Sequence, residues 1–204
     1  MKVLWLVSFR PIGKSKSNDL FQSMFVDSVK SLNNNIYFSL TQFDEANVKK
    51  FIKEKKIKSF YKNISKKKLP PGKKYSNKLM LANALDQFIE KGKFDYLVFS
   101  TADIIVPNNL FNFLKKINLK NFCGFVFPNT QIINGELKNT FWPYFGIDLI
   151  IFKIDKKKAR EFRKIIKFYN QYDWGVIENF YIAACEVLRL KKINLYKKMK
   201  VIKF

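Results

Sequence analysis

The segment FDYLVFSTADIIVP, residues 94–107, decides the fold of this sequence. Its first half is a continuous apolar run rich in β-forming residues, which is typical of a buried strand in a parallel sheet. The run ends at the triplet Thr101-Ala102-Asp103, and a short apolar turn follows up to Pro107. Because open α/β sheets bind ligands outside the carboxyl ends of their strands, Asp103 is the leading candidate for a site residue. The alternative is that Asp103 only caps the following turn, which is a common role of aspartate.

Other segments repeat the same alternation of strand and helix signals. Apolar runs predict strands at residues 3–9, 36–40 and 123–127, in one sheet with a strand at 95–101. Helical spacing predicts helices over 19–32 and 76–91, packed on that sheet. Further elements are expected as helices at 44–58, 108–117, 156–168 and 173–190, as strands at 145–153 and 199–204, and as a loop at 62–74. The order predicts a single α/β domain with a mostly parallel central sheet flanked by helices.

The composition is strongly basic. The 204 residues include 39 Lys+Arg and 16 Asp+Glu, which gives a formal net charge of +23. Such a charge predicts anionic partners, whether a nucleoside diphosphate, an anionic membrane surface or a nucleic acid, although lysine-rich coding bias would explain it equally well. The sequence has no histidine and no CxxC pair, which argues against a classical zinc site. Cys123 and Cys185 lie in apolar surroundings and are expected to be buried, reduced thiols.

The amino-terminal apolar run is interpreted as a strand and not as a signal peptide. Arg10 and Pro11 follow it directly, and no cleavage pattern of small residues is present. No apolar stretch is long enough to span a bilayer. The expected location is cytoplasmic, with peripheral contact at the anionic inner face of the membrane.

Residues 75–109 resemble the donor-site region of β-1,4-galactosyltransferase-type enzymes. Asn77-Lys78-Leu79 corresponds to part of the family's helix motif N-x-A-K-L-L-N, and Phe99 to Asp103 corresponds to its strand end F-S-D-x-D. Other motifs follow in the family's order, namely Val7-Ser8-Phe9-Arg10, Ile36-Tyr37 with Gln42, Tyr144-Phe145-Gly146 and YDWGVIEN at residues 172–179. The resemblance implies a Rossmann-like GT-A glycosyltransferase fold. It implies one domain over 1–204, with a nucleotide-sugar-binding half at 1–107 and an acceptor-side half at 108–204.

The resemblance also implies an activity and a set of site residues. The implied reaction is an inverting transfer of a galactose-like hexose from a UDP-sugar to a glycan or lipid-linked acceptor. The donor side would use Arg10, Lys78, Thr101 and Asp103, with Asp103 as a ligand of Mn²⁺ or Mg²⁺. Glu178, with Asp173 in reserve, would be the base that activates the acceptor hydroxyl.

The sequence departs from the family's pattern at three positions. Thr101 stands where the first aspartate of D-x-D is found, Asn179 stands at the position of the base, and Phe204 stands where a histidine ligand is found. These departures favour one alternative, a degenerate domain that binds nucleotide sugar without turnover. A basic α/β nucleic-acid-binding protein is the other, but its lysines are spread along the chain and no recognised nucleic-acid motif is present.

Overall fold

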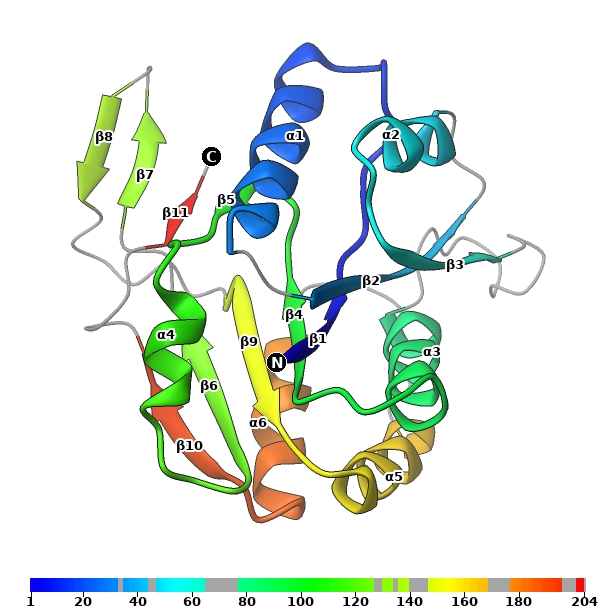
Figure 1. Ribbon diagram of the computed structural model, residues 1–204, viewed down its shortest axis with the longest axis vertical. Helices are drawn as coiled ribbons and strands as arrows, with labels where there is room; N and C mark the ends of the chain where they lie inside the picture. Colours follow the sequence, from blue (N-terminus) through cyan, green and yellow to red (C-terminus); the bar gives the residue numbers. More distant parts are fainter. Residues whose placement is uncertain are drawn as a thin grey trace.

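A seven-stranded mixed sheet forms the centre of the molecule (Figure 1). The computed structural model describes residues 1–32, 35–43, 47–64, 77–126, 130–133, 136–139, 147–168, 177–195 and 201–203. The strand order is β10-β6-β9-β4-β1-β2-β3. The bounds are β1 Lys2–Leu6, β2 Asn35–Phe43, β3 Ser59–Ile64, β4 Tyr96–Ser100, β6 Phe122–Val126, β9 Leu149–Lys153 and β10 Lys191–Asn194. Strand β9 is antiparallel to β4 and β6, and the other neighbouring pairs are parallel.

A smaller sheet of four strands lies at the upper left of Figure 1, beside the carboxyl terminus. Its order is β5-β11-β7-β8, with bounds β5 Ile104–Ile105, β11 Ile202–Lys203, β7 Thr130–Ile133 and β8 Glu136–Asn139. Strand β11 pairs antiparallel with β5 and parallel with β7. The last described residues of the chain therefore lie directly beside the segment that follows β4.

Helices cover both faces of the central sheet. Their bounds are α1 Lys16–Lys30, α2 Val48–Glu54, α3 Asn77–Glu90, α4 Leu110–Lys115, α5 Lys156–Ile165 with the 3₁₀ turn η2 Ile166–Phe168, and α6 Ile177–Val187. Side chains of α1, α2 and α4 share one buried cluster with Val3 and Trp5 of β1, whereas α3, α5 and α6 share the other with Leu4 and Leu6. Because alternate residues of a strand point to opposite faces, a central strand covered on both sides has to be apolar throughout.

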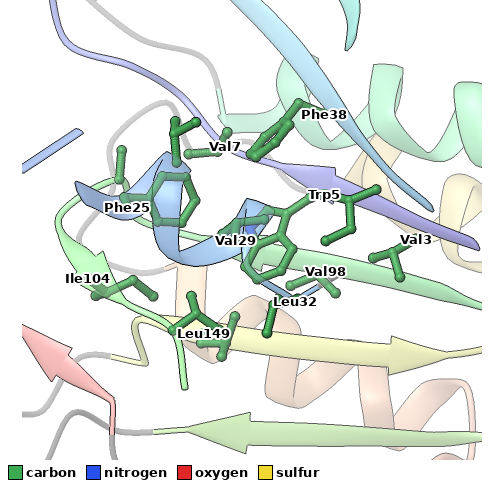
Figure 2. Close-up of a cluster of buried hydrophobic side chains, with 14 of the residues drawn as sticks. Val3, Trp5, Val7, Phe25, Val29, Leu32, Phe38, Val98, Ile104 and Leu149 are labelled. Carbon is green, nitrogen blue, oxygen red and sulfur yellow. The ribbon is translucent and has the colours of Figure 1, made fainter. Parts of the chain in front are cut away.

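Trp5 is the centre of the α1-side core (Figure 2). Its side chain is fully buried, and its ring packs edge-on against Phe25 of α1, with 6.0 Å between ring centroids. The indole Nε1 donates a hydrogen bond of 2.8 Å to the Ser100 hydroxyl. This bond fixes β1 to the last residue of β4, immediately before Thr101.

The structure confirms the predicted fold class. The four strands expected at 3–9, 36–40, 95–101 and 123–127 lie in one sheet as β1, β2, β4 and β6, and the helices expected at 19–32 and 76–91 pack on it as α1 and α3. Cys123 and Cys185 are buried and free, as expected. No helix in the described part of the chain combines the length and apolarity needed to cross a membrane.

Several predicted boundaries are wrong. The first strand ends at Leu6, and the helix expected over 44–58 is the shorter α2. The expected loop at 62–74 begins inside β3, which pairs in parallel with β2 at the edge of the sheet. Strand β10 was not predicted either. Edge strands are paired on one side only and need no continuous apolar run, so their sequences give a weak signal.

Replacing Trp5 tests the core directly. Trp5→Ala should lower the free energy of unfolding by about 3–5 kcal/mol, because it leaves a large cavity and removes the Ser100 partner. Leu20→Ala, at a residue 56% exposed on α1, is the control and should change it by less than about 0.5 kcal/mol. Urea unfolding monitored by circular dichroism measures both. Equal losses in the two variants would contradict the packing described here.

Candidate functional site

The candidate site lies where the order of the strands reverses. The chain passes from β1 outward through β2 to β3, and then returns to β4 on the other side of β1. In open α/β sheets such a switch point, at the carboxyl ends of the strands, is the usual ligand position. Thr101, Ala102 and Asp103 follow β4 at this point, in the middle of the central sheet.

Four polar side chains meet there. The Nζ of Lys203 lies 2.9 Å from Oδ1 of Asp103 and 2.9 Å from Oδ1 of Asp148. It also lies 3.5 Å from the Thr101 hydroxyl, which donates to Oδ1 of Asp148 at 3.3 Å. We call Thr101, Asp103, Asp148 and Lys203 the strand-end cluster.

Strand pairing brings these residues together from distant parts of the sequence. Ser100 of β4 pairs with Leu149 of β9, and the Thr101 amide donates to the Asp148 carbonyl at 3.3 Å. That extension of the ladder puts Asp148 beside Thr101. Lys203 of β11 pairs with Ile104 of β5, the residue after Asp103.

The cluster is largely shielded from solvent. The side chains of Asp148, Lys203 and Asp103 are 6%, 12% and 26% exposed. Burial raises the pKa of Asp148, and the neighbouring ammonium of Lys203 opposes that shift without cancelling it. Burial alone would lower the pKa of Lys203, but Asp148 and Asp103 outweigh it and raise that pKa, so the side chain is charged near neutral pH.

The second carboxylate oxygen of Asp148 is buried and has no hydrogen-bond partner within the described ranges. An unsatisfied buried acceptor is costly, which is consistent with the raised pKa of this group. Asp103 is the more exposed acid, so it is the one that a ligand arriving from solvent would meet first.

The other predicted donor-side residues make contacts elsewhere. Arg10 follows β1, and its guanidinium donates to Asn18 at the start of α1 at 3.1 Å. Lys78, in the first turn of α3, donates through Nζ to the Lys167 carbonyl in η2 at 3.0 Å. The structure thus brings Thr101 and Asp103 together and engages Arg10 and Lys78 with neighbouring helices.

The predicted base lies outside what the structure describes. Glu178 is the second residue of α6, but its side chain is not among the described ones, and Asp173 falls in the undescribed range 169–176. The assignment of either residue as base stays a prediction. Phe204 also lies outside the described residues.

Asp148 and Lys203 are two cluster residues that the sequence does not predict. Asp148 stands directly before the apolar run LIIFK, and a single carboxylate at the start of a buried strand was the available signal. Lys203 is one basic residue among the 39 of the chain, and nothing in the sequence around it distinguishes it from the others. Only the pairing of β11 with β5 identifies it.

No protein-family model matches this sequence, and no curated protein does. Solved structures do resemble it. A protein from Desulfovibrio desulfuricans, provisionally named a nucleotide-diphospho-sugar transferase, is 15% identical, with 96% of this chain and 80% of that chain covered and a TM-score of 0.54. The inositol-1-phosphate CTP transferase of T. maritima is 9% identical, with 98% and 88% covered and a TM-score of 0.56.

A third structure, 4-diphosphocytidyl-2C-methyl-D-erythritol synthase from Anaerococcus prevotii, is 12% identical, with 95% and 88% covered and a TM-score of 0.54. None of these three is a β-1,4-galactosyltransferase, so that finer resemblance stays a prediction. At these identities the likeness concerns the fold alone: the chain has the mixed α/β fold, with helices on both faces of a central sheet, of these nucleotide-diphospho-sugar and nucleotidyl transferases.

Proposed function

We propose that this protein is a transferase that uses a nucleotide-activated sugar. In its specific form, the proposal is an inverting transfer of a hexose from a UDP-sugar to a glycan or lipid-linked acceptor. The strand-end cluster at the switch point carries the proposal. The motifs that resemble β-1,4-galactosyltransferases and the likeness to a nucleotide-diphospho-sugar transferase fold support it.

The chemistry of glycosyl transfer explains why this position matters. The leaving nucleoside diphosphate gains negative charge as the glycosidic bond breaks, so fixed positive charge has to lie close to it. The cluster has an ammonium group held in place by two carboxylates, with Asp103 toward solvent. The net charge of +23 would also raise the local concentration of an anionic donor.

The remaining roles follow the two halves of the chain. We propose that residues 1–107 bind the donor and that residues 108–204 face the acceptor, with Arg10 near the diphosphate and Glu178 or Asp173 as the base. Lys78 is proposed as a further cation for the donor; in the structure its Nζ donates to the Lys167 carbonyl in η2. Asp148 and Lys203 come from the second half, so the cluster itself belongs to both.

Nucleotidyl transfer is the second candidate. Two of the three similar structures are named for cytidine-nucleotide chemistry, a CTP transferase and a diphosphocytidyl-methylerythritol synthase. In such a reaction the leaving group is pyrophosphate. Pyrophosphate also gains negative charge as it leaves, so positive charge at the carboxyl end of the strand would stabilise it in the same way.

A ligand panel separates these candidates. UDP-glucose, UDP-galactose, UDP and CTP are each added to the purified protein, and the melting temperature is measured. A ligand at 100 times its Kd should stabilise the folded state by about 2.7 kcal/mol, which corresponds to roughly 5–10 °C for a chain of this size. A shift with UDP-hexoses and release of UDP supports sugar transfer.

Other outcomes of the panel point to the alternatives. A shift with CTP and release of pyrophosphate supports nucleotidyl transfer. A shift with UDP-hexoses without turnover supports the degenerate, non-catalytic domain. If no nucleotide shifts the melting temperature and the protein instead binds DNA or RNA with steep salt dependence, the proposal is wrong and the nucleic-acid alternative gains.

Asp103→Asn tests the site. Turnover should fall about 100-fold, because the variant removes one of the two carboxylates that hold the cluster's ammonium in position. The free energy of unfolding should drop by only about 1 kcal/mol, since the Asp103 carboxylate is partly exposed and Lys203 keeps Asp148.

The control is Asp27→Asn, which removes a comparable carboxylate–lysine pair between Asp27 and Lys55 on the surface. Steady-state release of nucleotide and urea unfolding are measured for both variants. Wild-type turnover in Asp103→Asn, with donor binding unchanged, would remove Asp103 from the site.

A basic face of α5 supports the proposed contact with an anionic membrane. Lys157, Arg160 and Lys164 are exposed on this helix, and Phe168 beyond it is 77% exposed. A lysine or arginine near a membrane of anionic lipid contributes about 1 kcal/mol of attraction. Reversing all three charges to glutamate should therefore weaken binding to phosphatidylserine vesicles at least about tenfold.

Sedimentation with vesicles measures this effect, and vesicles of phosphatidylcholine alone give the background. The matched control reverses three exposed lysines of α2, Lys49, Lys50 and Lys53, and so changes the net charge equally. Equal weakening by the two triple variants would show that net charge, and not the α5 face, governs membrane binding.

A further inference from the structure

The side chain of Lys203 is mostly buried, unlike that of a typical surface lysine. The residue lies on β11, between β5 and β7 of the small sheet, and its side chain is only 12% exposed. Its ammonium group is equidistant, at 2.9 Å, from a carboxylate that follows β4 and a carboxylate that precedes β9. Hydrogen bonds between charged groups at this distance are the strong ones.

The two carboxylates require a cation where they meet. Asp103 and Asp148 repel each other, and that repulsion adds to the effect of burial on the Asp148 pKa. Burying two such groups without a counter-charge would be unfavourable. A divalent metal ion or an ammonium group could supply the positive charge, and the structure holds the ammonium of Lys203 there.

A divalent cation does not fit this position while Lys203 is in place. Mg²⁺ binds oxygen ligands at about 2.0–2.1 Å and would have to lie between the same two carboxylates, against the positive charge of Lys203. In the described ranges, no group of three or more histidine, cysteine, aspartate or glutamate side chains converges to hold a metal. The whole sequence has no histidine to complete one.

We propose that Lys203 is a resident cation that takes the place of a divalent metal ion at the strand-end cluster, so that an anionic nucleotide diphosphate binds there without metal. The replacement of a metal ion by Lys203 is inferred from the geometry of the cluster alone, whereas the identity of the ligand rests on the proposed function. The small sheet then has a role, because its strand β11 places the positive charge of Lys203 in the cluster. Asp103 and Asp148 hold the ammonium group, and Lys203 offsets one of their two negative charges, which weakens their repulsion of the ligand.

The first test uses metal alone, with no nucleotide. Mn²⁺ binding is measured by electron paramagnetic resonance on the wild type, on Lys203→Ala and on Lys138→Ala, a control lysine of β8 in the same small sheet. The wild type and the control should show no site with a Kd below 1 mM, on the order expected for weak surface binding. Lys203→Ala should gain one site, because it leaves two carboxylates and a hydroxyl without their cation.

The double variant Lys203→Ala with Asp103→Asn should lose the gained site. A wild-type Mn²⁺ site that Asp103→Asn removes would overturn the proposal, and this arm does not depend on whether Lys203→Ala folds. Failure of a folded Lys203→Ala protein to gain a site would overturn it as well. Lys203→Arg, which keeps the positive charge, should not bind Mn²⁺ at the cluster.

The second test adds UDP and is read by calorimetry. EDTA should change the wild-type Kd by less than twofold. In Lys203→Ala the Kd should rise about tenfold in EDTA, which corresponds to the loss of one charge-assisted contact, and Mn²⁺ should restore it. Loss of wild-type binding in EDTA, with recovery on adding Mn²⁺, would overturn the resident-cation proposal. Absence of UDP binding in every protein and condition would count against the proposed function, whereas the metal-only test would still decide the role of Lys203.

Discussion

Two carboxylates meet at the carboxyl end of the central strand, and the ammonium group of Lys203 lies between them. Three parts of the chain converge at this contact: the segment after β4, the residue before β9, and β11. Strand β11 has only two residues, so its backbone ladder contributes little to holding it in place. The buried charges constrain it further, because moving Lys203 away would leave the Asp148 carboxylate buried without a counter-charge. The small sheet and the central sheet are thus joined by this ion pair as well as by the short chain segment between β4 and β5.

The contact also explains how a strongly basic protein places acids at its candidate site. An anionic ligand approaching two unpaired carboxylates would be repelled, and the site would work against the field of the remaining lysines. With Lys203 between them, one of those two negative charges is compensated locally. The arrangement is rigid, since Thr101 also bonds Asp148 and the Trp5 indole fixes the preceding Ser100. Preorganised charge of this kind is what stabilises a leaving diphosphate.

The sequence predicts the centre of this fold well because buried parallel strands are apolar on both faces. The runs at β1 and β4 are therefore visible without any structure, and Asp103 stands out as the polar end of such a run. Strand β9 gives the same apolar signal, yet its antiparallel direction depends on which neighbours it meets. The roles of Asp148 and Lys203 likewise depend on which distant segments they meet. Their importance arises from pairings over 55 and 100 residues, and no local pattern encodes such pairings.

The central claim is that a nucleotide diphosphate binds at the carboxyl end of β4 with Lys203, and not a metal ion, as the cation. The most direct measurement is a crystal structure of the protein grown with UDP and MnCl₂, with data collected at the manganese absorption edge. The account predicts nucleotide density beside Asp103, Lys203 still between Asp103 and Asp148, and no anomalous peak at that position. A manganese peak between the two carboxylates with Lys203 displaced, or a nucleotide bound elsewhere on the molecule, would contradict it.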